Sequence, residues 1–81
     1  MEQRGVIHYA LESVRVAQHE VIQAQANGDP QNVQRAAQHM KIARDRLDEV
    51  RGKAETDEEK REIARAEELL RHLEEARNGM A

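Results

Sequence analysis

The feature that most limits the fold of this chain is the recurrence of apolar residues at helical spacing in three separate segments. In each segment they return every three or four positions, which places them on one face of an α-helix. Turn and cap residues gather between the segments, at residues 27–30 and 52–57. The pattern predicts an all-α fold, an antiparallel three-helix bundle with helices at about residues 5–27, 30–52 and 57–78.

The first break between segments has the residues of a helix end followed by a helix start. Gly28 is expected to close the first helix in the left-handed conformation that glycine tolerates. Asp29 can accept a hydrogen bond from a free backbone N–H, and Pro30, which has no N–H of its own, suits the first helical position. A strong helix start is therefore predicted at Pro30.

The second break carries a stop and a capping box. Gly52 is the expected end of the second helix. In Thr56-Asp57-Glu58-Glu59, the Thr56 hydroxyl is expected to accept from the Glu59 backbone N–H while the Glu59 carboxylate reaches back. The acidic residues also oppose the positive end of the helix dipole, so the third helix should begin here.

Short connections make consecutive helices antiparallel neighbours, so residues equidistant from a loop should lie at one level. Folding the chain at Gly28 sets Val14 against Ala43 and Ala17 against Met40, pairs of one large and one small residue that can pack closely. The whole chain, residues 1–81, is expected to form one domain around this core. The predicted core consists of Val6, Ile7, Ala10, Leu11, Val14, Ala17, Val21, Ile22, Ala24, Val33, Ala36, Ala37, Met40, Ala43, Leu47, Val50, Ile63, Ala66, Leu69, Leu70, Leu73 and Ala76.

Six polar residues fall on the apolar stripes and need a partner or solvent. They are Gln18, Gln25, Arg44, Arg51, Glu67 and Glu74. We expect them at the seams between helices, with Arg44 and Glu67 as an interhelical ion pair that fixes the register more than it stabilises the fold. A buried polar network that binds a ligand or specifies an oligomer is the alternative interpretation.

The four histidines do not form a ligand pattern. His19, His39 and His72 should lie at a similar level, yet each projects away from its apolar stripe, and His8 lies three turns before His19. No His-x3-His or Glu-x-x-His pair supplies two ligands from one helical face, so neither a metal nor another cofactor is predicted. A histidine-based metal- or pH-responsive bundle stays as an alternative function.

Apolar residues on the outside of the first two helices indicate a candidate interaction surface. Tyr9, Val16 and Ile42 sit nearly opposite the apolar stripes, and His19 and His39 should lie beside them. Scattered exposed apolar residues are ordinary, and that interpretation stays open. The outer face of the third helix is almost wholly charged, so a protein partner or a second copy is expected to bind the first two helices.

Composition excludes several classes of function. Charged residues make up 36% of the chain, but both signs are interspersed at a net charge of −3, so no basic stripe is available for nucleic acid. No apolar run is long enough for a membrane span. The chain has no cysteine, which fits a reducing cytoplasm, and its one serine, Ser13, lacks the context of a nucleophile. No catalytic residue is predicted.

The segments NGDPQNV and TDEEKREIARAEELLRHLEEARNG resemble those of de novo designed helical bundles. The resemblance covers about residues 27–79 and implies a scaffold or protein-interaction module. The first helix, GVIHYALESVRVAQHEVIQAQA, departs from an idealised design in its glycine, histidines and glutamines, departures that would suit an intended interface. The plan is also similar to small uncharacterised helical proteins of Gram-positive bacteria, which would imply a cytoplasmic regulatory protein acting by protein contacts.

Overall fold

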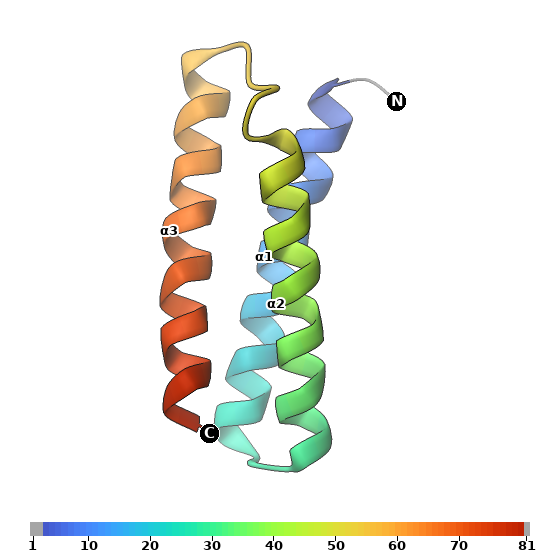
Figure 1. The fold of residues 1–81 in the computed structure, drawn as a ribbon, viewed down its shortest axis with the longest axis vertical. Helices are drawn as coiled ribbons and strands as arrows, with labels where there is room; N and C mark the ends of the chain where they lie inside the picture. Colours follow the sequence, from blue (N-terminus) through green and yellow to red (C-terminus); the bar gives the residue numbers. More distant parts are fainter. Residues whose placement is uncertain (1–2, 81) are drawn as a thin grey trace.

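Three α-helices packed against one another make up the fold in the computed structural model, which describes residues 3–80 and the side chains of residues 5–78. The helices are α1 (Gln3–Ala26), α2 (Pro30–Val50) and α3 (Asp57–Met80). α1 and α2 are antiparallel neighbours, and α3 runs back along both in a body of 40 × 22 × 15 Å (Figure 1). The prediction of an all-α three-helix bundle is confirmed.

The connection between α1 and α2 confirms one prediction and corrects another. The Asp29 side chain accepts from the Gln31 N–H at 2.9 Å, and Pro30 occupies the first helical position, as expected. Gly28, however, is not left-handed, since no described glycine has a positive φ. The chain instead reverses through a bond from the Asp29 N–H to the Asn27 carbonyl (2.7 Å) and through extended backbone at Asp29 (φ −56°, ψ 129°).

The connection between α2 and α3 contains the predicted capping box. The Glu59 N–H donates to the Thr56 hydroxyl at 3.0 Å, and the Glu59 carboxylate accepts from the backbone N–H groups of Thr56 (3.2 Å) and Glu55 (3.0 Å). α2 ends at Val50, two residues before the expected limit, because the chain tightens into a turn closed by a bond from the Lys53 N–H to the Val50 carbonyl (2.9 Å). Helix ends commonly finish in such a turn.

The core forms one continuous cluster of buried apolar side chains from all three helices. Its members are Ile7, Ala10, Val14, Ala17, Val21, Ala24, Ala36, Met40, Ala43, Leu47, Val50, Ile63, Ala66, Leu70 and Leu73. The prediction for Ile22 is wrong: its side chain is 53% exposed, because Val21 and Ala24 take the buried positions and Ile22 lies around the helix from both.

None of the three helices, over the residues that the structure describes, contains an apolar stretch of the length that a membrane span requires.

Candidate interaction surface

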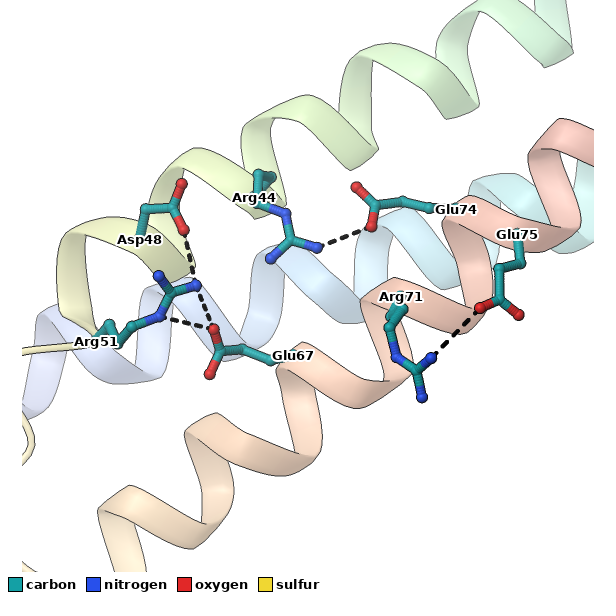
Figure 2. Close-up of polar contacts among 7 residues, drawn as sticks. All are labelled: Arg44, Asp48, Arg51, Glu67, Arg71, Glu74 and Glu75. Atoms are coloured by element: carbon teal, nitrogen blue, oxygen red, sulfur yellow. Dashed lines mark hydrogen bonds and ion pairs between the residues drawn. The ribbon is translucent and has the colours of Figure 1, made fainter.

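Arg44 of α2 and Arg51, the residue that caps the C-terminus of α2, hold the acidic edge of α3. Arg44 donates to Glu74 at 2.8 Å, and the Arg51 Nε donates to Glu67 at 2.8 Å, as Figure 2 shows. Arg51 also contacts Asp48, in the last turn of α2, at 2.9 Å. Glu67, Glu74 and Arg44 are half-buried, so these side chains lie at the α2–α3 seam, where the sequence places them.

The partners in these ion pairs differ from the predicted Arg44–Glu67 pair, which is wrong. Helical side chains lean toward the N-terminus of their helix, so those of antiparallel neighbours lean in opposite directions. The arginines of α2 lean away from the connecting loop while the glutamates of α3 lean toward it. In addition, α3 begins beyond the end of α2 (Figure 1). Arg44 therefore meets Glu74, seven residues farther along α3 than Glu67.

The ion pairs change the proton affinities of exposed groups. The pKa of Arg51 is raised, chiefly by its hydrogen bond to Glu67 and by the charge of that carboxylate. On the outer side of α3, the hydrogen bond from Arg71 lowers the pKa of Glu68. A lowered carboxyl pKa contributes stability at neutral pH, and this contribution is lost as the pH falls through the folded-state value. Arg71 also contacts Glu75 at 3.5 Å (Figure 2), and His72 contacts Glu68 at 3.2 Å.

A shallow depression lies across α1 and α2, and it collects most of the predicted interaction residues. It has a volume of about 330 Å³ and is lined by Tyr9, Glu12, Ser13, Val16, His39 and Ile42. Its large apolar side chains are well exposed: 48% for Tyr9, 38% for Val16 and 45% for Ile42. We call the depression, together with Arg46 beside it, the α1–α2 face.

Arg46 is a member of this face that the sequence interpretation missed. Its guanidinium carbon lies 4.0 Å from the centroid of the Tyr9 ring, and its Nη2 lies 3.5 Å from the Tyr9 hydroxyl. The contact is a cation–π interaction that orients the ring. A signal for it was present, because Tyr9 and Arg46 are nearly equidistant from the Gly28 turn and therefore share a level. Glu12 and Ser13 were missed as well.

The histidines behave differently from one another. His39 is half-buried and lines the depression, whereas His19, which the sequence placed on the same surface, is exposed and is not among the lining residues. His8 and His72 are also exposed. Among the described residues, no group of three or more histidine, aspartate and glutamate side chains is arranged to hold a metal ion.

Comparison with protein-family models, with curated proteins and with solved structures finds no match to this chain. A functional conclusion must therefore come from the chemistry of the α1–α2 face itself.

Proposed function

We propose that this chain is a non-enzymatic protein-interaction module that binds its partner through the α1–α2 face. The observation that carries the proposal is the convergence of Tyr9, Val16 and Ile42, from two helices, on one depression. Apolar side chains that gather in this way lose unfavourable contact with water when a partner covers them. On the described part of α3 no large apolar side chain is exposed, and its outer side carries the Arg71–Glu68 and Arg71–Glu75 ion pairs.

The chemistry of the face suits a protein partner. An apolar centre is flanked by Glu12 and Arg46, the arrangement of a small interface with a polar rim. Tyrosine and arginine are also the residue types that most often carry binding energy at interfaces, and Tyr9 and Arg46 are held together before any partner arrives. Such pre-organisation lowers the entropy cost of binding.

The proposal assigns no catalytic role to Ser13, the one serine of the chain. The Ser13 hydroxyl, which lies in the depression, donates to the Tyr9 carbonyl of its own helix at 2.9 Å, as helical serines often do. The resemblance of residues 27–79 to designed bundles would agree with a scaffold role and stays a prediction.

Selection from a displayed library of amphipathic helical peptides tests the proposal. Peptides enriched on the wild-type protein are compared on Val16→Glu, Ile42→Glu and the matched control Ala64→Glu, which adds the same charge at an exposed alanine of α3. We expect the two α1–α2 variants to weaken binding at least about tenfold and the control to leave it unchanged.

Two results would contradict the proposal. Enriched peptides could bind Val16→Glu and Ile42→Glu as tightly as wild type, which would place their site elsewhere. Alternatively, no peptide could be enriched while the chain also stays monomeric at every concentration, which would leave the α1–α2 face without a partner.

A further inference from the structure

We infer that the partner covering the α1–α2 face is a second copy of this chain. The two copies pack about a two-fold axis that runs parallel to the helices, so that α1 of each copy lies opposite α2 of the other. This inference rests on the proposed function and names the partner. It is argued from the levels at which apolar and charged residues lie on the two helices.

The Arg46–Tyr9 contact fixes those levels. Because Arg46 lies over the Tyr9 ring, these two positions share a level on the antiparallel helices. Eleven residues farther along α1 is Glu20, and eleven residues back along α2 is Arg35. Eleven residues are about three helical turns, so Glu20 and Arg35 return to the same face and also share a level. Val16 and Ile42, which line one depression, lie between these two levels.

The apolar centre is self-complementary about this axis. A two-fold rotation about an axis along the helices keeps every residue at its own level and exchanges α1 with α2. Val16 of one copy then lies within about one helical turn of Ile42 of the other, close enough for the two side chains to pack, and the same contact occurs a second time. Val16 and Ile42 are 38% and 45% exposed in the single chain, and both would be covered.

The charges on the two helices are complementary in the same arrangement. On the side of α1 that borders the face the charged residues are Glu12 and Glu20, and on the corresponding side of α2 they are Arg35, Arg46 and, two turns after Ile42, Glu49. The two-fold axis sets Glu20 of α1 against Arg35 of α2, and Glu12 close to Arg46. Opposite charges placed in this way favour association and fix its register.

The other two-fold arrangement brings like charges together on α1. An axis perpendicular to the helices would place α1 on α1, and Val16 would stack on Val16 of the second copy. Glu12 and Glu20 lie four residues on either side of Val16, so each Glu12 would then face Glu20 of the other copy. On α2 the same axis would set Arg35 against Glu49, so this attraction is offset by the repulsion on α1. The parallel axis pairs opposite charges at both Glu20 and Glu12 and is therefore favoured.

The resulting assembly has four central helices and an α3 on each outer side. Every central helix has antiparallel neighbours, the usual arrangement in helical bundles. The charged outer side of α3, with its own ion pairs, stays in water. A domain of this size has a small core, and covering Val16 and Ile42 adds apolar burial to it.

Sedimentation from micromolar to millimolar concentration measures the association. The single chain has a mass of 9.3 kDa, and we expect the wild-type mass to rise to twice this value. Val16→Glu should raise the dissociation constant at least about tenfold, since it places a carboxylate in the centre of the contact. Ala64→Glu should leave it unchanged. Circular dichroism of both variants checks that they remain folded, as exposed sites should allow.

Cysteine cross-linking tests the orientation, and the absence of native cysteine keeps it clean. Val16→Cys and Ile42→Cys chains are mixed and oxidised, and the products are identified by mass. We expect the mixed disulfide between the two variants to dominate, because it requires α1 opposite α2. Dominant self-cross-linking of Val16→Cys would overturn the orientation.

A wild-type chain that stays monomeric at every concentration would overturn the inference of a second copy. That result would not decide the proposed function, because helical peptides selected on the monomer could still depend on Val16 and Ile42. Loss of that dependence would remove the function, so the two failures are distinguishable.

Discussion

The two sides of α2 differ in the side chains that lie at their edges. Toward α3, Arg44 and Arg51 extend across the seam and bind Glu74 and Glu67. On its other side, α2 carries Ile42 beside the outer edge of α1, and this side chain is 45% exposed. Ion pairs within the chain close the α2–α3 seam, whereas the α1–α2 face leaves apolar side chains exposed to water.

This difference indicates where recognition can occur. A seam closed by charge-assisted hydrogen bonds would lose those bonds if a partner displaced them. The α1–α2 face, by contrast, has little to lose, since Tyr9 and Arg46 already hold each other and Val16 is exposed. The bundle thus separates the edge that holds α3 from the edge that is available for binding.

Truncation of a buried core residue should have the largest effect on stability, and truncation of an apolar residue on the α1–α2 face should have a small one. Leu70 of α3 is fully buried, so Leu70→Ala should lower the free energy of unfolding by about 2–5 kcal/mol. Ile42→Ala, on the α1–α2 face, should change it by only about 0.5 kcal/mol when measured on dilute, monomeric protein. Guanidinium unfolding followed by circular dichroism measures both. Equal losses would show that Ile42 belongs to the core and would end the comparison.

The cap that starts α3 should have an intermediate effect. The Glu59 carboxylate accepts from two backbone N–H groups and its side chain is 8% exposed, so Glu59→Ala should cost about 0.5–2 kcal/mol of unfolding free energy. Glu58→Ala is the matched control, because Glu58 lies in the same acidic first turn but is exposed. A loss for Glu58→Ala as large as that for Glu59→Ala would show that charge near the helix start, and not the cap, stabilises α3.

The elements that local chemistry determines were predictable from the sequence. Asp29-Pro30 and the Thr56–Glu59 box act through neighbours three residues away or fewer, so the helix starts follow directly from residue types. The buried alanines and leucines follow from their spacing in the same way. The candidate surface was also partly predictable, because Val16 and Ile42 lie on the outer side of their helices.

What the sequence could not provide depends on how side chains lean between helices. Equidistance from a loop locates backbones only roughly, because the opposite lean of Arg44 and Glu74 and the start of α3 beyond the end of α2 together move the meeting point by two turns. The level that Tyr9 and Arg46 share follows from the sequence, but equidistance from a loop does not determine that the guanidinium lies over the ring and not in water. Ile22 was misplaced because it adjoins a buried valine, and the edge of an apolar stripe is set only when the neighbouring helix is in place.

The interhelical ion pair itself should contribute least. Arg44→Glu and Glu74→Arg each place like charges at the α2–α3 seam, while the double swap restores opposite charges. We expect the coupling in this double-mutant cycle to be about 0.2–1 kcal/mol at low salt and to shrink in molar salt, since both side chains are partly solvated.

The exchange of Lys41 and Asp45, which are exposed neighbours of Arg44 on α2, is the control cycle and should show no salt-dependent coupling between α2 and α3. Zero coupling for Arg44 and Glu74 at low salt would mean that the aliphatic stems, and not the charges, close the seam. The α2–α3 seam and the α1–α2 face would then differ only in how much apolar surface is covered, and not in their electrostatics. In that case Arg44→Met should retain the stability of the wild-type seam, because a methionine of similar reach covers the same core without a charge.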